Sequence, residues 1–556
     1  MDNSGSRLWL KRARFLMRRG KNLTCPQCGF DLRDAPLYSE WRVCDNCGHH
    51  FPLNALQRIK TLADPKTFHE LEKYLATHPR GFEYAQRVRE AKRKTHLREA
   101  VVIGTAKIHN CELMLVVLDF RFMGGTMGEA AGEKITRAFE HAAERKLPLV
   151  AVTASGGARI QEGMVALMQM AKTVAAVNRF EQLGLPYITV LTNPTTGGVY
   201  ASFANLADVI LAEPRALIGF AGPRVVEILT HEKLPKDSHR AEFLLEHGMV
   251  DAVVLRTELR RVIGNVLGTV QARGNPLTVP IPLKSGTNST MLSSWESVQL
   301  ARHPDRPTTL DYLQRVFTDF VELHGDHFYG DDPAIIAGVA KLQGQGVVVI
   351  GQERGHGEAR IKHHEGKAEP EGYRKAERLM RLASKWNLPI VTFVDTPGAS
   401  PGYEAEKRGI AMSLAHSIAT MLQMRVPTIA VVIGEGGSGG ALALAAADRV
   451  LMLEHAVYSV ISPEGASAIL YGDDAHASEL AETLHLTAHD LRKRRIIDEI
   501  IPEPVGGAHK DAAAAAQTMK AYLLHALNEL VGKSSDELRQ ARYEKYRAMG
   551  NARSEG

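Results

Sequence analysis

The sequence predicts an α/β protein made of two copies of one domain, with a small metal-binding ribbon in front of them. Internal repetition is the first observation behind this prediction: Leu147-Pro148 recurs as Leu388-Pro389, 241 positions later. Each pair opens an apolar run that ends in a glycine turn and a helix-forming stretch. The second observation is a set of two Cys-x-x-Cys pairs near the N-terminus. Repetition at constant spacing indicates duplication, and buried runs that alternate with helices indicate parallel sheets.

The composition excludes several classes of protein. The 556 residues are 44% hydrophobic and 24% charged, so a long disordered chain is excluded and about three domains are expected. The net charge of +5 is too small to indicate nucleic acid or membrane as the main partner. No apolar stretch reaches the roughly 18 residues of a membrane helix. Five cysteines are too few for a disulfide scaffold, so a reducing, cytoplasmic location is predicted, with Cys111 in the core.

Residues 1–21 are predicted to form a basic N-terminal tail, with seven basic residues and one acidic residue. The apolar cluster Phe15-Leu16-Met17 is too short for the core of a secretory signal, and serine is sparse for an organellar transit peptide. We interpret the segment as a solvated tail. Contact with nucleic acid or another anionic surface is the alternative.

Residues 22–55 are predicted to form a ribbon around one structural zinc ion per chain. Its ligands would be Cys25 and Cys28 from the first pair, and Cys44 and Cys47 from the second. Four thiolates complete a tetrahedral shell, so the metal would have no open catalytic position. His49-His50 are therefore expected to be exposed polar residues. A ribbon beside a basic tail also fits a nucleic-acid-binding module, but that alternative explains only about the first 55 residues.

The rest of the chain is predicted to divide into two domains of similar length. They extend over 56–285 and 308–530, with a linker at 286–307 and a charged C-terminal tail at 531–556. The stretch 271–307, which includes Pro276, Pro280, Pro282 and the run Ser285–Thr290, has the composition of a linker. The alanines at 512–516 predict the start of a C-terminal helix.

The glycine turns leave several chemical interpretations open. The segment Gly434–Gly440 matches both the dinucleotide fingerprint and, through Gly436-x-Ser438-x-Gly440, the nucleophile elbow. The corresponding segment of the first copy, Asn193–Gly198, matches neither pattern. Glycines needed only for a tight strand–helix joint are a further alternative. Both copies share paired glycines before a helix, and backbone N–H groups there can stabilise an anion. Two such oxyanion holes fit the transfer of a carboxyl group between two enolate-like partners.

Longer motifs carry a resemblance to a known family. The first 285 residues or so resemble the beta subunit of the carboxyltransferase component of bacterial-type acetyl-CoA carboxylase, and the residues from about 301 onward resemble its alpha subunit. The segments that carry the resemblance, besides the cysteine pairs, are Phe122–Gly128, Ala154–Glu162, Leu167–Lys172, Pro194–Gly198, Leu217–Arg224, Ala301–Pro304, Pro370–Ala376, Asp395–Ala399, Gly434–Gly440, Ile461–Gly465 and Ile501–His509.

The resemblance implies two crotonase-like (ClpP/crotonase superfamily) domains in tandem and a specific reaction. The carboxyl group of carboxybiotin would move to acetyl-CoA and give malonyl-CoA, the first committed step of fatty acid synthesis. The beta-like half would bind the CoA thioester and the alpha-like half the biotin. Another short acyl-CoA substrate is the alternative. The implied catalytic residues are Gly197, Gly198, Gly439 and Gly440, and the implied substrate-binding residues are Ser155, Gly156, Gly157, Ala158, Arg159, Gly398, Ala399, Gly437 and Ser438.

The resemblance also implies partners. Biotin would be supplied in trans on a biotin carboxyl carrier protein, because Met519-Lys520-Ala521 departs from the Met-Lys-Met biotinylation signal. No phosphate-binding loop of the G-x4-G-K-[ST] type occurs, so biotin carboxylase is expected to be a separate polypeptide. The family usually has separate beta and alpha subunits, whereas here both lie in one chain. A homo-oligomer, a dimer or larger, is expected if the halves meet across chains.

Overall fold

The computed structural model describes residues 23–222, 226–228, 231, 233–235, 237–272 and 292–550. The basic tail predicted over 1–21 and the first part of the predicted linker lie outside the described residues. None of the helices in the described ranges combines the length and apolarity that a bilayer crossing requires.

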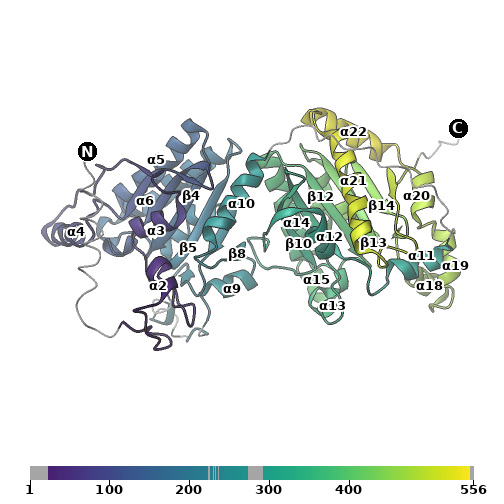
Figure 1. Cartoon of the computed structure of the whole chain (residues 1–556), viewed down its shortest axis with the longest axis horizontal. Helices are drawn as coiled ribbons and strands as arrows, with labels where there is room; N and C mark the ends of the chain where they lie inside the picture. Colours follow the sequence, from purple (N-terminus) through teal and green to yellow (C-terminus); the bar gives the residue numbers. More distant parts are fainter. Residues whose placement is uncertain are drawn as a thin grey trace.

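The chain folds into two halves that lie side by side, each built on an eight-stranded sheet within the described residues (Figure 1). The first half has strands β1 (His69–Leu71), β2 (Val101–Ile108), β3 (Cys111–Leu118), β4 (Leu149–Ser155), β5 (Tyr187–Thr196), β6 (Val209–Ala212), β7 (Ile218–Gly219) and β8 (Ala252–Val253). Its helices are α2 (Pro36–Trp41), α3 (Ala55–Leu62), α4 (Phe82–Thr95), α5 (Glu129–Arg145), α6 (Met164–Glu181), α7 (Gly197–Tyr200), α9 (Ala241–Glu246) and α10 (Leu259–Gln271).

The second half repeats this plan. Its strands are β9 (Thr318–Glu322), β10 (Ile335–Leu342), β11 (Gln345–Gln352), β12 (Ile390–Thr396), β13 (Thr428–Gly437), β14 (Arg449–Leu453), β15 (Val457–Ser459) and β16 (Glu499–Ile501). Its helices are α11 (Ser294–Ala301), α12 (Thr309–Val316), α13 (Ala359–Lys362), α14 (Pro370–Trp386), α15 (Tyr403–Lys407), α16 (Ile410–Leu422), α17 (Ser438–Ala445), α18 (Pro463–Tyr471), α19 (Ala477–Leu484), α20 (Ala488–Lys493), α21 (Ala512–Leu530) and α22 (Ser535–Arg547).

The two sheets have matching topology, which confirms the predicted duplication. The first has the order β1-β2-β3-β4-β5-β6-β8, and the second has the order β9-β10-β11-β12-β13-β14-β16. Strands β3 to β6 and β11 to β14 are parallel, and the strands before them in each order are antiparallel. Short extra strands, β7 and β15, pair with β5 and β13. Each half is therefore an α/β layer with a parallel centre, as the alternating apolar runs predict.

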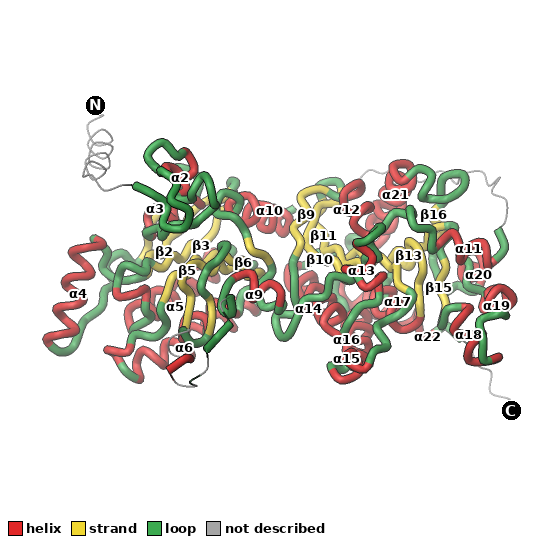
Figure 2. Tube along the Cα trace, turned by 90° about the horizontal axis from the view of Figure 1, so that it is seen from below, coloured by secondary structure: helices red, strands yellow, loops and turns green. Residues whose placement is uncertain are grey.

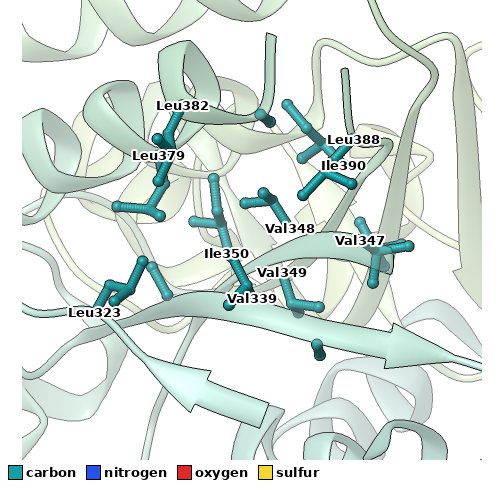
Figure 3. Packing of buried hydrophobic residues seen from close by; sticks show 14 of the residues in the cluster. Leu323, Val339, Val347, Val348, Val349, Ile350, Leu379, Leu382, Leu388 and Ile390 are labelled. Atoms are coloured by element: carbon teal, nitrogen blue, oxygen red, sulfur yellow. The ribbon is translucent and has the colours of Figure 1, made fainter. Parts of the chain in front are cut away.

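The core of the second half is packed around β11, which is buried along its whole length. Val348 and Ile350 of this strand lie near Leu379 and Leu382 of α14, as Figure 3 shows. β-Branched residues favour a strand whose two faces are both covered, because their stiff side chains pack on the pleated surface. In the first half, Cys111 is buried at the start of β3, which confirms its predicted place in the core.

The two halves share one core across α10, which lies between the sheets in both views (Figures 1 and 2). A Cβ on Gly346 would lie 2.1 Å from the carbonyl oxygen of Thr269, so β11 and α10 meet backbone to backbone. Asp251 of the first half accepts hydrogen bonds from Arg378 at 2.8 Å and from His327 at 2.9 Å. The relative position of the halves therefore depends on both apolar and ionic contacts.

The predicted linker and tail are partly structured. Helix α11 lies inside the range predicted as a linker, begins at a capping box on Ser293 and packs against α19. Helix α21 begins at Ala512, as predicted, with Asp511 as its cap. Helix α22 lies inside the range predicted as a tail, yet its Arg542 is fully buried against Asp448. The domain boundaries themselves stay predictions.

Candidate active site and metal centre

In the first half, two turns meet at the carboxyl ends of neighbouring parallel strands. β4 ends at Ser155, β5 ends at Thr196, and the strands pair through Ser155 and Thr195. A Cβ on Gly157 would lie 3.0 Å from the nitrogen of Gly198, so the turns pack backbone against backbone. Ser155 fixes the first turn, because its Oγ accepts the N–H of Gly157 at 3.0 Å.

In the second half, β12 and β13 end in the same arrangement. Thr396 takes the place of Ser155, and its Oγ1 accepts the N–H of Gly398 at 3.0 Å. A Cβ on Gly440 would lie 2.5 Å from the nitrogen of Ala399, which is again a contact between two backbones. The predicted residues of each half are therefore brought together, within each half, by the same fold element.

The strand register places the counterpart of Gly197-Gly198 one residue before the implied pair Gly439-Gly440. Strand pairing places the second turn 241 positions after the first. By this register Gly197 corresponds to Ser438 and Gly198 to Gly439, rather than to the pair Gly439-Gly440. The backbone angles agree, because φ is 59° at Gly197 and 53° at Ser438. Gly440 is buried one residue further along α17.

Each turn presents backbone N–H groups that the helices do not use. Gly198 lies in the first turn of α7 and Gly439 in the first turn of α17, where N–H groups have no acceptor within the helix. The nitrogen of Ala158 lies beside the first of these groups, 3.4 Å from a Cβ built on Gly198. In the second half, the nitrogen of Ala399 lies 2.5 Å from a Cβ built on Gly440, the residue after Gly439. Such N–H groups can stabilise negative charge on an oxygen.

A cavity of about 510 Å³ opens at the turn of the first half. Its wall includes Gly156 and Ala158 from the turn itself, together with Met123, Gly124 and Ile160. Two of the predicted substrate-binding residues therefore border open space. All of the wall residues belong to the first half.

The side chain of Arg159 points into the protein. It is fully buried, and its guanidinium donates to Glu99 at 2.5 Å and to the carbonyl of Thr126 at 2.7 Å. Although burial opposes the charge, the hydrogen bond with Glu99 raises the pKa of Arg159. Arg159 therefore holds its loop in place from the protein interior. Its buried side chain does not line the cavity, contrary to the expectation that it binds substrate.

Charged residues that sequence reasoning missed surround the second turn. Arg354 forms ion pairs with Asp395 at 3.4 Å and Glu435 at 3.1 Å. Arg302 lies in the segment Ala301–Pro304, for which the sequence predicts no role. It pairs with Glu435 at 2.5 Å and with Glu464 at 2.7 Å. Burial raises the pKa of Asp395, and Arg354 opposes this. Because these acids all have cationic partners, the cluster holds the ends of β12 and β13 in place.

Within one chain the two turns lie in different halves. Figures 1 and 2 both show β5 in the first half and β13 in the second, on opposite sides of α10. A common cavity bordered by both turns therefore requires a second copy of the chain.

The four predicted metal ligands form one cluster. Their sulfur atoms all lie within 4.8 Å of one another. The Sγ atoms of Cys25 and Cys47 are 3.7 Å apart, and so are those of Cys28 and Cys44. The glycine after each pair has a positive φ, 73° in the first and 68° in the second, which the tight turn around the sulfur atoms requires. The four cysteines can therefore hold a metal ion.

Buried charges that sequence reasoning missed attach the ribbon to the first half. Glu213 pairs with Arg58 and, at 2.9 Å, with Arg256, whose guanidinium also donates to the carbonyl of Trp41 in the ribbon at 2.8 Å. Burial alone would raise the pKa of Glu213, but the two arginines hold it well below its usual value. The side chain of His50 is 6% exposed and lies 3.6 Å from Glu213, so the expectation of an exposed residue is wrong.

Known proteins resemble the chain over nearly its whole length. A family model described as acetyl co-enzyme A carboxylase carboxyltransferase-like matches residues 283–550. The acetyl-coenzyme A carboxylase carboxyl transferase subunits beta/alpha of Natranaerobius thermophilus are 44% identical, covering 95% of this chain and 91% of the relative. Those of Salinispora arenicola are 46% identical, covering 95% and 96%.

Separate subunits and solved structures match as well. The alpha subunit of Geobacter sulfurreducens is 53% identical over 46% of this chain and 81% of the relative. The crystal structure of transcarboxylase 12S covers 100% of this chain and 99% of its own, with a TM-score of 0.72 at 21% identity, which shows the shared crotonase-like fold. The identities to full-length relatives decide the family: the chain belongs to the acetyl-CoA carboxylase carboxyl transferase subunits beta/alpha and is a carboxyltransferase.

Proposed function

We propose that the protein moves the carboxyl group of carboxybiotin, held by a biotin carrier protein, to acetyl-CoA and so forms malonyl-CoA. The observation that carries this proposal is the duplicated pair of backbone turns in a chain of this family. One turn would serve the thioester, and the other would serve the biotin.

The chemistry needs charge stabilisation more than a protein base. Removing a methyl proton from acetyl-CoA places negative charge on the thioester oxygen, and the N–H groups of Gly198 and Ala158 would stabilise it. The N–H groups of Gly439 and Ala399 would stabilise the ureido oxygen of biotin. Breaking the bond between the ureido nitrogen of carboxybiotin and its carboxyl group would release CO₂ and leave a nitrogen that can accept the methyl proton. The resulting enolate would then form its new carbon–carbon bond to the CO₂. Turns built from glycines suit this chemistry, because the protein supplies backbone N–H groups and the biotin supplies the base.

A second copy would complete the site. Ile160, just before α6, is 84% exposed, and Met164 and Met168 on that helix are exposed as well. In the second half, Ile469 and Leu470 of α18 are 74% and 64% exposed. Apolar surfaces of this kind mark protein interfaces. We therefore infer a homo-oligomer, a dimer or larger, in which the first half of one chain faces the second half of another.

We infer that the metal is zinc. A Zn–S distance near 2.3 Å puts the sulfur atoms of a tetrahedral site about 3.8 Å apart. The two separations of 3.7 Å between cysteine sulfur atoms agree with this value. With four protein ligands the ion would be structural.

The proposal includes partners and a location. The carrier protein and the biotin carboxylase would be other polypeptides, and the enzyme would work in the cytoplasm, where thiols stay reduced. Nucleic acid would at most be a minor partner, through the ribbon and the basic N-terminal segment.

The reverse reaction tests the proposed function directly. Purified, zinc-loaded protein incubated with malonyl-CoA and biocytin should form acetyl-CoA, and omission of biocytin should abolish the reaction. Folded protein that forms no acetyl-CoA would refute the proposal. Competition among acetyl-CoA, propionyl-CoA and butyryl-CoA would then identify the preferred acyl group.

A further inference from the structure

One side of the cavity in the first half carries positive charge. Arg87 and Lys94 of α4 line it, with Glu90 and Ala91 between them, and Arg121 contributes from the loop after β3. Figure 2 shows α4 at the end of the first half that lies away from the second half. The cavity therefore runs from the glycine turn to a basic surface at the edge of the molecule.

The packing of α4 explains why these residues face the cavity. The helix buries Tyr84, Val88, Ala91 and Thr95, and its core contacts include the fully buried Phe122. Positions 87, 90 and 94 are spaced three and four residues apart, so they form a single stripe beside the buried face. The stripe borders the cavity as a consequence.

The charges on this stripe are available to a ligand. Arg87 has no ion-pair partner within the described part of the chain. Lys94 pairs with Glu90 at 2.6 Å, but the two side chains are 65% and 49% exposed, and such a pair is weak. Arg121 is held by the buried Asp119 at 2.8 Å and is itself 47% exposed. Three cations against one exposed carboxylate make this wall of the cavity attractive to an anion.

We propose that Arg87 and Lys94 bind the 3′-phosphate of the CoA thioester and that Arg121 binds its diphosphate. The inference rests on the proposed function, which supplies a ligand with a thioester at one end and phosphates at the other. The glycine turn at one end of the cavity matches the thioester, and the cations at the other end match the phosphates. The apolar wall formed by Met123 and Ile160 lies along the pantetheine between them.

Calorimetric titration of the full-length protein with coenzyme A and with 3′-dephospho-coenzyme A tests the inference. The double variant Arg87→Ala/Lys94→Ala should weaken coenzyme A binding about tenfold, the loss of two partly exposed charge contacts. The same variant should change the affinity for 3′-dephospho-coenzyme A much less. The variant Glu90→Gln should tighten coenzyme A binding, because it frees Lys94 from its carboxylate.

Arg89→Ala/Arg93→Ala is the matched control, since it removes the same charge from the same helix at positions outside the cavity wall. It should leave both affinities unchanged. Equal losses in the two double variants would show a general charge effect and overturn the inference. Equal losses for the two ligands would overturn the phosphate assignment. Because the titration measures binding alone, a chain that binds coenzyme A in this way without catalysing transfer would refute the proposed function only.

Discussion

The C-terminal helix offers a sharp test of how the second half is held together. The guanidinium of Arg542 in α22 bonds both carboxylate oxygens of Asp448, at 2.9 and 2.7 Å. It also donates to backbone carbonyls, among them that of Met424 at 2.9 Å. The two side chains are only 0% and 4% exposed. Arg542→Met keeps much of the volume and removes the charge, so a buried carboxylate is left without its cation.

Breaking a buried ion pair on one side costs about 3–5 kcal/mol. For a domain of this size that corresponds to a fall in Tm of roughly 6–20 °C. Differential scanning calorimetry measures this change. Arg539→Met on the same helix is the matched control, because its pair with Asp536 is exposed and is worth less than about 1 kcal/mol. Asp448→Asn added to Arg542→Met should recover part of the loss. A loss below about 1 kcal/mol for Arg542→Met would contradict the docking of α22.

Three further predictions follow from the ribbon, the second turn and the contact between the halves. Removal of the metal with a chelator, or the substitution Cys28→Ala, should unfold the ribbon and leave the two sheets intact. Proteolysis would detect the unfolded ribbon, and circular dichroism would detect the intact sheets. A ribbon that stays ordered without metal would contradict a structural role for the ion. Gly437→Ala should destabilise the fold, because its Cβ would lie 2.2 Å from a backbone oxygen. Gly439→Ala should fold normally and lower turnover, because the atom nearest to its Cβ would be 3.9 Å away. Thermal melts and turnover rates that are the same for the two variants would refute this prediction. Burial would raise the pKa of Asp251, but Arg378 and His327 lower it from 3.8 to about 2, so the carboxylate contributes about 2 kcal/mol of stability that is complete above about pH 4 and is lost as the pH falls toward 2. Asp251→Asn should therefore be less stable than the parent at pH 7, and urea unfolding should show the gap closing in acid; a gap independent of pH would contradict the ionic contact.

Much of the fold follows from local sequence signals. The duplication is visible because Leu147-Pro148 and Leu388-Pro389 each precede a buried strand, β4 and β12. Strands of matching position then pair in matching register. The metal cluster is visible because two Cys-x-x-Cys pairs fix the geometry of their own turns. In these cases the chemistry depends on residues close together in the chain.

The remaining features depend on contacts between distant residues. Glu213, Arg58 and Arg256 meet only in the folded protein, and each one alone has the pattern of a surface charge. The burial of Arg159 follows from Glu99, 60 positions earlier. The backbone angle of a turn is equally hidden, because Ser438 adopts a positive φ that a glycine pattern would assign to its neighbours. Such features require the tertiary structure.

A mixed oligomer tests the central claim most directly. Gly198→Val would block the first turn and Gly439→Val the second, and each variant alone should be inactive in acetyl-CoA formation from malonyl-CoA and biocytin. Two differently tagged variants, co-expressed and purified through both tags, would leave one composite site intact in a dimer. The account predicts about half of the parent rate from this mixed oligomer. Complete inactivity of folded, metal-loaded mixed oligomers would contradict a site formed by the turns of two chains.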